Sequence, residues 1–356
     1  MKISELRLED FRNYASERVV FDDGINIVNG RNAAGKTNLL EAIYLFAIGK
    51  SPLAVKDKEL VRMGALRAHI SADVFDMYRT RKMDVVIDSS GRKQIAVDSV
   101  PLLKVSELLG TFNVVFFSPD DLKMISEAPS DRRKFTDVSL SQQSKLYGQS
   151  LTRYNYVLAQ RNKLLKTFKN KQSTLDTLEV WDGELIKAGA EVLRLRNEFI
   201  TRLIPLAREK HFYLSGESEE LTLSYDGITE NYLDAFTAAL CAARDKDIEL
   251  AYTTVGPHRD DIAIRVNDTD VRKYGSRGQQ RTASLALKLA ETEVFRKVSG
   301  EYPVLLLDDV MSELDDTRKS RLISAVDGIQ TFITDTTFKC DNARKFLVDS
   351  GKVLSY

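Results

Sequence analysis

Residues 30–37 read Gly30-Arg31-Asn32-Ala33-Ala34-Gly35-Lys36-Thr37 and fit the pattern G-x-x-x-x-G-K-[ST]. They follow a strand-like run at residues 25–28 and precede a helical pattern that begins at Lys36. Glycines let the backbone bend so that its N–H groups and the helix N-terminus converge on phosphate oxygens. This context predicts a phosphate-binding loop, and the alternative is a glycine-rich turn that caps an ordinary helix.

Two carboxylates that follow a second apolar run would complete a nucleotide site. Residues 304–307 are all Val or Leu, and Asp308 and Asp309 come directly after them. Parallel strands end at one edge of a sheet, so we expect Asp308 beside the loop, where it and Thr37 would hold Mg²⁺. Lys36 would reach the β and γ phosphates, and Asp309 would polarise an attacking water. A buried strand followed by an acidic turn is the alternative.

A second possible anion site lies late in the chain. Ser276, Gly278 and Gln279 open a strongly periodic helical pattern over residues 279–298, so free backbone N–H groups would again face an anion. A single bound nucleotide does not require two such anion sites in one subunit. An ordinary N-cap followed by a turn is the alternative for these residues.

The composition is typical of a protein that folds into a globular structure in a reducing compartment of the cell. Of the 356 residues, 43% are apolar and 29% charged, which disfavours disorder and a minimal disulfide scaffold. Lys plus Arg and Asp plus Glu both number 52, so any polyanion site has to be local. The cysteines Cys241 and Cys340 lack metal-site spacing, and no run approaches the ~20 apolar residues of a membrane span. We expect a cytoplasmic protein with no membrane partner.

Strand and helix patterns divide the chain into three segments. Residues 1–120 are rich in strand patterns, and residues 121–245 are mainly helical. Residues 246–356 return to alternating strands and helices, with the first strand expected at 248–252. We therefore predict an α/β head with mixed sheets, built from both ends of the chain, and an inserted mainly helical lobe.

Several further motifs carry a resemblance to a known family. The phosphate loop, the Ser-x-Gly-Gln segment and the strand that ends in two aspartates resemble the ATPase head shared by ABC and SMC proteins. The sequence is most similar to the RecF family of bacterial recombination mediators, over essentially the whole chain. The similar segments, in order, are residues 11–14 (FRNY), 117–122 (FSPDDL), 131–135 (DRRKF), 256–261 (GPHRDD) and 312–315 (SELD).

The resemblance implies an ABC/SMC-type P-loop ATPase head that uses ATP and Mg²⁺ in a site shared by two subunits. ATP on the phosphate loop of one subunit would meet Ser276, Gly278 and Gln279 of a second. Bound ATP would thereby hold two subunits together as a homodimer, and the second anion site would bind the ATP of the partner subunit. The other residues that the resemblance assigns to the bound ATP or the partner are Arg12, Asn13, Asn38 and Asp315.

The family also implies binding to double-stranded DNA and to single-strand/double-strand junctions. Its members are implied to act with RecO and RecR in loading RecA at gaps during repair and replication restart. A run without acidic residues between Asp137 and Asp176 is the expected DNA surface, and a solvated helix face is the alternative. The basic residues predicted to contact DNA are Arg153, Arg161, Lys163, Lys166 and Lys169.

The sequence departs from the general ABC pattern in three places. Asp309 stands where most heads have Glu, and the shorter carboxylate predicts a slow Mg²⁺-dependent ATPase. Thr334 follows the last core strand, where a switch His is usual, and no Gln follows residues 114–117. Asp120 or Asp121 could serve in place of that Gln.

Two other functional classes remain open. An ATPase subunit of a nuclease or other SMC-like complex would carry a similar head, but the helical insertion here lacks a Cys-x-x-Cys hook. A small-molecule phosphotransferase would leave residues 276–279 and the basic run unexplained. His258, next to Arg259 and Asp260, is interpreted as part of an ion-paired structural turn rather than a metal ligand.

Overall fold

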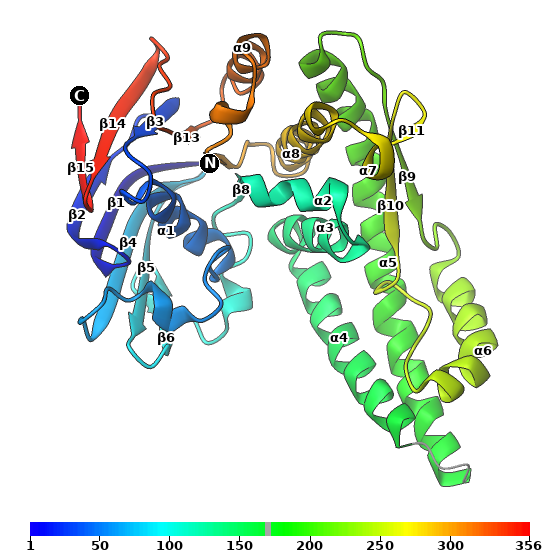
Figure 1. Cartoon of the computed structure of the whole chain (residues 1–356). Helices are drawn as coiled ribbons and strands as arrows, with labels where there is room; N and C mark the ends of the chain where they lie inside the picture. The colour runs from blue at the N-terminus through cyan, green and yellow to red at the C-terminus, as the bar shows by residue number, and fades with distance from the viewer. Residues whose placement is uncertain (168–171) are drawn as a thin grey trace.

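The computed structural model describes residues 1–167 and 172–356, arranged as a head and an arm (Figure 1). The head contains two large sheets and both chain termini. The arm consists of long helices that extend away from the head. The α/β fold with mixed sheets and a helical region, predicted from the sequence, is confirmed.

The first sheet of the head is antiparallel and comes from the N-terminal third of the chain. Its strands alternate between the core and the outside, and Met83, Val85 and Ile87 show this period of two with fully buried side chains. In order across the sheet, its strands are β2 (Tyr14–Val20), β1 (Lys2–Phe11), β4 (Arg67–Phe75), β5 (Thr80–Asp88), β6 (Lys93–Val97) and β7 (Val100–Pro101).

The second sheet joins the two ends of the chain. In order, its strands are β15 (Lys352–Ser355), β14 (Ala343–Asp349), β3 (Ile25–Asn29), β13 (Thr331–Asp335), β12 (Val304–Asp308) and β8 (Val114–Phe117). All neighbours are parallel except β15 and β14. β12 is buried along its whole length, as expected for a strand inside a parallel sheet. The carboxyl ends of β3, β13 and β12 therefore meet at one edge.

The head contains the helices α1 (Lys36–Ile48), α8 (Arg277–Ser299) and α9 (Asp316–Ala325). α8 connects head and arm, because Leu285 and Leu289 pack on the second sheet while Ala283 and Leu287 belong to the core of the arm. The arm contains α4 (Lys145–Lys166), α5 (Gln172–Ser215) and α6 (Tyr232–Leu250), and a small sheet of β11 (Thr269–Asp270), β10 (Asp261–Val266) and β9 (Leu221–Asp226). The remaining α-helices of the described residues are α2 (Lys123–Ser126), α3 (Pro129–Gln143) and α7 (Val271–Tyr274).

The strand expected at residues 248–252 is wrong, because α6 continues through Leu250. The alternation of Ile248 with Glu249 is a pattern that is typical of a strand. In the structure, however, the preceding Asp247 is fully buried and forms an ion pair with Arg161 of α4. This contact fixes the end of α6 against α4. The division of the chain at residues 120 and 245 stays a prediction.

Candidate functional site

The phosphate-loop residues lie between β3 and the start of α1 and enclose the Lys36 ammonium group. Lys36 Nζ donates hydrogen bonds to the carbonyl oxygens of Gly30 at 2.7 Å and Arg31 at 3.1 Å. The first turn of α1 contains no acidic residue, so the positive end of its dipole is not neutralised. Backbone N–H groups, a helix N-terminus and an ammonium group are thus gathered at one place, as an anion site requires.

Arg12 and Asn13, the residues expected to border the nucleotide, hold the loop and α1 in place. Asn13 Nδ2 donates to the Ala34 carbonyl at 2.7 Å, and Asn13 Oδ1 accepts from Asn38 Nδ2 at 2.9 Å. A Cβ on Gly35, whose φ is 120°, would lie 2.5 Å from Asn13 Nδ2, so this position requires glycine. The fold therefore brings Asn13 and Asn38 to the phosphate loop.

Arg12 is fixed by a buried glutamate that belongs to none of the recognised motifs. Arg12 Nε and Nη2 donate to the two carboxylate oxygens of Glu41 at 2.7 and 2.8 Å. The Glu41 carboxylate raises the pKa of Arg12, and Glu41 itself is fully buried in α1. The only sequence signal for this pair is a charged residue inside an otherwise apolar helical stripe.

Thr37 and Asp308, the residues predicted to hold Mg²⁺, are in direct contact. Thr37 Oγ1 donates to Asp308 Oδ1 at 2.9 Å, and Thr334 Oγ1 donates to the same oxygen at 2.6 Å. Burial raises the pKa of the Asp308 carboxyl, against the opposing effect of these hydrogen bonds. A hydroxyl and a buried carboxylate are hard oxygen ligands, and they fit a small divalent cation such as Mg²⁺.

Thr334 is a site residue whose role the sequence did not reveal. Its hydroxyl, besides donating to Asp308, accepts a hydrogen bond of 2.9 Å from the Asp309 backbone N–H. It occupies the position expected for the switch His of other heads, at the end of β13 beside β12. Asp309 has an exposed side chain and a φ of 52°, a left-handed conformation that is strained for a residue other than glycine. The turn after β12 is thus held by Thr334.

Asp121, one of the two possible substitutes for the missing Gln, is already engaged. Asp121 accepts from the Ser118 backbone N–H at 2.8 Å and forms an ion pair of 3.1 Å with Lys288 of α8. Asp120 is largely exposed and pairs with Lys123 at 2.7 Å. The loop after β8 is therefore tied to α8 through Asp121, and Asp120 has the more accessible carboxylate.

The predicted second anion site at residues 276–279 forms a capping box at the start of α8. The Ser276 N–H donates to Gln279 Oε1 at 3.0 Å, and the Gln279 N–H donates to Ser276 Oγ at 3.2 Å. Gln279 Nε2 also donates to Glu219 at 3.0 Å. Figure 1 shows α7, which leads into this end of α8, on the far side of α8 from α1. The fold therefore separates this anion site from the phosphate loop of the same chain.

Asp315 caps α9 and is paired within its own chain. Its side chain accepts from the Arg318 backbone N–H at 2.9 Å and from Arg318 Nη1 at 2.8 Å. Arg318 also approaches Gly278, since a Cβ on that glycine would lie 3.9 Å from Arg318 Nη1. Arg318 therefore links Asp315 to the neighbourhood of Gly278, and the contact of both residues with a partner stays a prediction.

The predicted DNA contacts do not form one surface. Arg161 was wrongly included, because its side chain is fully buried and pairs with Asp182 at 2.6 Å and Asp247 at 2.7 Å. Arg153 is half-exposed and pairs with Glu184 at 2.6 Å. The exposed residues Lys163 and Lys166 form no ion pair within the described chain, and Lys169 lies outside the described residues. Helical periodicity explains the error, because Arg161 lies on the inner face of α4.

Known ATPases and DNA repair proteins resemble this chain. The AAA ATPase domain family matches residues 1–182. The DNA replication and repair protein RecF of Agathobacter rectalis is 42% identical over 98% of this chain and 96% of its own. The RecF of Halothermothrix orenii is 44% identical and covers 100% of this chain and 99% of its own.

Solved structures agree with the sequence relatives. The structure of the recombination mediator protein RecF with ATP has a TM-score of 0.89 and 36% identity, and the match covers 99% of this chain and 97% of that one. An Smc head domain from Pyrococcus furiosus has a TM-score of 0.61 at 17% identity, which supports the fold alone. Within the described residues, no helix is long and apolar enough to cross a membrane. The chain therefore belongs to the RecF family of DNA replication and repair proteins.

Proposed function

We propose that this chain is an ATP-dependent, DNA-binding recombination mediator with a slow Mg²⁺-dependent ATPase. The observation that carries the proposal is the meeting of Thr37 with Asp308 beside the phosphate loop. Relatives named as DNA replication and repair proteins, one of them solved with ATP, support the assignment. The nucleotide would be bound by residues 30–38, with Arg12 and Asn13 next to it.

The residues around the loop have separate tasks in hydrolysis. Lys36 would exchange its bonds to the Gly30 and Arg31 carbonyls for bonds to phosphate oxygens, and its charge would offset that of the transition state. Thr37 and Asp308 would hold Mg²⁺, which supplies charge neutralisation when bound. The exposed carboxylate of Asp309 would orient water, and its short side chain makes turnover slow.

A second copy of the chain would complete the site. The N–H groups in the first turn of a helix have no acceptor inside that helix, so those of Arg277 and Gly278 are available to phosphate oxygens. The phosphate loop of the same chain lies on the other side of α8 (Figure 1). ATP held by one subunit would therefore be covered by Ser276, Gly278, Gln279 and Asp315 of another.

Sizing by light scattering tests the shared site. We expect ATP with Mg²⁺ to produce a dimer of the wild type, and Lys36→Met to remove both ATP binding and the dimer. Ser276→Arg is expected to remove the dimer but retain ATP binding by the monomer. Ser89→Arg, on the exposed hairpin after β5, is the matched control and should dimerise normally. A Ser276→Arg monomer without nucleotide affinity would contradict the two-subunit site.

The biological task follows from the family. We infer that the ATP-bound dimer binds double-stranded DNA and single-strand/double-strand junctions, and acts there with RecO and RecR to load RecA. The test is a gapped DNA coated with single-strand binding protein. The chain with RecO and RecR should accelerate RecA assembly, and Lys36→Met should not. Equal RecA assembly by the wild type and Lys36→Met would exclude this role.

A further inference from the structure

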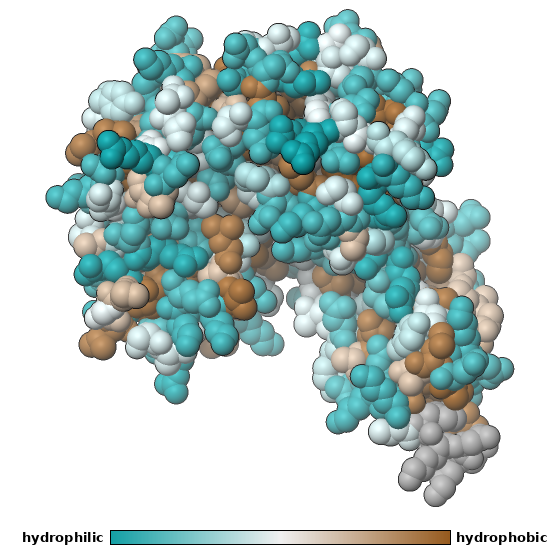
Figure 2. All heavy atoms as spheres, viewed as in Figure 1, coloured by the Kyte–Doolittle hydropathy of each residue, from teal (hydrophilic) through white to brown (hydrophobic). Residues whose placement is uncertain are grey.

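A cavity of about 610 Å³ lies between the head and the arm, away from the phosphate loop. On the head side it is lined by Lys50, just after α1, and by Ser106. On the arm side it is lined by α3, α4 and α5. Figure 2 shows the molecular surface hollowed between the two bodies. The volume lies within the range of about 300–1,000 Å³ that is typical of ligand sites.

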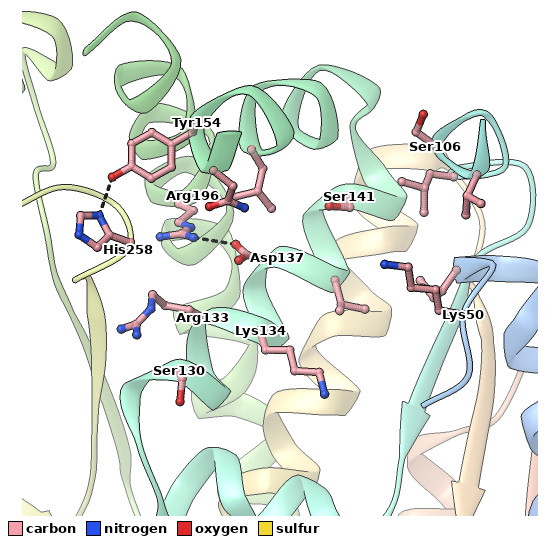
Figure 3. A pocket seen from close by; sticks show the side chains of 16 residues that line it. Lys50, Ser106, Ser130, Arg133, Lys134, Asp137, Ser141, Tyr154, Arg196 and His258 are labelled. Atoms are coloured by element: carbon pink, nitrogen blue, oxygen red, sulfur yellow. Dashed lines mark hydrogen bonds and ion pairs between the residues drawn. The ribbon is translucent and has the colours of Figure 1, made fainter. Parts of the chain in front are cut away.

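The charge of this cavity is positive and not neutralised by the protein. Lys50, Arg133 and Lys134 line it, and none of them forms an ion pair within the described residues. In Figure 3 the side chains of Lys50 and Lys134 extend into the space between the head and α3. The single carboxylate of the lining, Asp137, is already paired with Arg196 at 2.7 Å. Lys50 and Lys134 therefore face the cavity without a counterion, whereas the Arg133 guanidinium points toward the arm and is bonded to the Asp260 carbonyl.

Arg133 lines the cavity from α3, and its guanidinium is held on the arm side. Its Nη1 donates to the Asp260 carbonyl at 2.7 Å, but no carboxylate contacts the guanidinium within the described residues. Burial, and then repulsion from Arg196, lowers the pKa of Arg133, against the opposing effect of the nearby carboxylates of Asp261, Asp260 and Asp137. Partly buried charges without partners are unfavourable, and they are found where a ligand supplies the opposite charge.

Hydrogen-bond donors accompany the cations. Ser106, Ser130, Ser141 and Asn155 line the cavity, and their side chains make no hydrogen bond within the described residues. Hydroxyl and amide donors next to Lys and Arg are the usual partners of phosphate groups in nucleic-acid complexes. His258 is not among the free donors, because Tyr154 and the Thr253 carbonyl occupy both of its ring nitrogens.

The adjoining cavity gives a contrast. It measures about 390 Å³ and shares Ile48, Lys50, Lys134 and Val138 with the first. Its lining contains as many acidic as basic residues, and Lys123 and Lys288 are paired with Asp120 and Asp121. The two cavities therefore share the unpaired Lys50 and Lys134, and they differ in that the second also contains the carboxylates of Asp120, Asp121, Asp131 and Glu291.

We propose that this cavity, with Lys50, Arg133 and Lys134, is a phosphate site that takes the backbone of nucleic acid bound to the head. The inference rests on the proposed DNA-binding function and gives it a location that differs from the α4 surface predicted from the sequence. A linear polyanion suits a hollow that is open between two bodies, because a long chain can lie along it (Figure 2). Each bound phosphate would release counterions, so affinity would depend steeply on salt.

The test uses the full chain and a fluorescent DNA duplex with a single-strand tail, measured by anisotropy at several salt concentrations with ATP present. The double variant Lys50→Glu with Lys134→Glu is expected to weaken binding by at least about tenfold and to lower the salt slope by about 2. The matched control is Lys246→Glu with Lys352→Glu, which makes the same charge change at exposed positions outside the cavity. It should bind like the wild type, and both variants should bind ATP normally.

Three outcomes would overturn the inference while leaving DNA binding by the chain intact. One is an unchanged cavity variant, and another is an equal loss in the control pair. The third is a loss confined to Lys163→Glu with Lys166→Glu, which would place the contacts on α4. A wild type that binds no DNA at any salt concentration would instead refute the proposed function itself.

A free polyphosphate is the competing source of the same chemistry, and calorimetry with inorganic tripolyphosphate distinguishes it. The measurement uses the Lys36→Met background, in which the phosphate loop is disabled. We expect weak, unsaturable heats there. Saturable tripolyphosphate binding that is lost with Lys50→Glu and Lys134→Glu, without loss of DNA affinity, would assign the cavity to a small ligand and overturn the backbone site.

Discussion

Thr37 and Asp308 are 271 positions apart in the chain, and a hydrogen bond of 2.9 Å joins the Thr37 hydroxyl to the Asp308 carboxylate. Thr37 opens α1 after β3, and Asp308 ends β12, with β13 between the two strands. A third residue, Thr334 of β13, donates to the same carboxylate oxygen. Hydroxyl groups from the start of α1 and from β13 thus converge on one oxygen at the end of β12, and the following predictions probe this centre and the packing around it.

Asp308→Asn should abolish the dependence of ATP affinity on Mg²⁺. The amide oxygen can still accept from Thr37 and Thr334, so the fold should persist, but the charge that attracts the cation is gone. We expect ATP affinity with Mg²⁺ to fall to the value without it, as measured by nucleotide titration with and without the metal. Asp327→Asn, an exposed change near the end of α9, is the control. Retained Mg²⁺ dependence in Asp308→Asn would argue against the assigned ligand.

Asp309→Ala should stop hydrolysis while leaving ATP binding intact, because the exposed carboxylate is assigned to orient water and not to hold the nucleotide. The ATP-bound dimer should then persist longer than in the wild type, which is measurable by light scattering after ATP addition. Asp309→Glu is expected to hydrolyse faster than the wild type, since it restores the longer side chain. Wild-type turnover at tens per second would be incompatible with the slow-ATPase prediction.

Arg161→Met should destabilise the arm and not act on DNA. Its guanidinium is buried between Asp182 and Asp247, so the variant leaves the fully buried Asp247 without its cation, while Asp182 keeps its ion pair with Arg244. Breaking a buried ion pair in this way costs about 3–5 kcal/mol. We expect a correspondingly lower free energy of unfolding in urea, with a much smaller change for the exposed neighbour Lys163→Met. Equal stability of the two variants would show that the buried cluster has little energetic weight.

The environment of His258 predicts acid sensitivity. The neutral ring fits its contacts, because Nε2 can donate to the Thr253 carbonyl at 3.0 Å while Nδ1 accepts from the Tyr154 hydroxyl at 2.6 Å. Burial lowers the pKa of His258 from 6.5 to about 4. Between these values the unfolded chain binds the proton and the folded chain does not. The contribution of neutral His258 to the free energy of unfolding is therefore complete above pH 6.5, and it is lost as the pH falls towards 4.

A comparison with His258→Gln isolates this contribution. The difference in free energy of unfolding between wild type and variant should shrink as the pH falls from 6.5 to 4, as measured by urea titration at each pH. The paired measurement is needed because Glu291 acts in the opposite direction: burial raises its pKa to about 7, so its contribution to stability increases as the pH falls below 7. A difference that stays constant with pH would contradict the assigned neutral state of His258.

Several features of the site depend only on residues that are close together in the sequence, and these features can be predicted from the sequence. The phosphate loop needs glycines, a lysine and a threonine at fixed spacing, and Asp308 and Asp309 follow an apolar run that is typical of a buried strand. Ser276 and Gln279 form the capping box that their spacing of three predicts. These features depend on neighbours within a few residues, so the sequence alone contains them.

Other features depend on contacts between distant segments and arise only when the chain is folded. Arg161 resembles a surface cation in the sequence, but α6 brings Asp247 against it, and α6 continues through Leu250 beyond this contact. Thr334 becomes a site residue through its place at the end of β13, beside β12. A charge or hydroxyl acquires its role from what faces it, and long-range packing alone determines that.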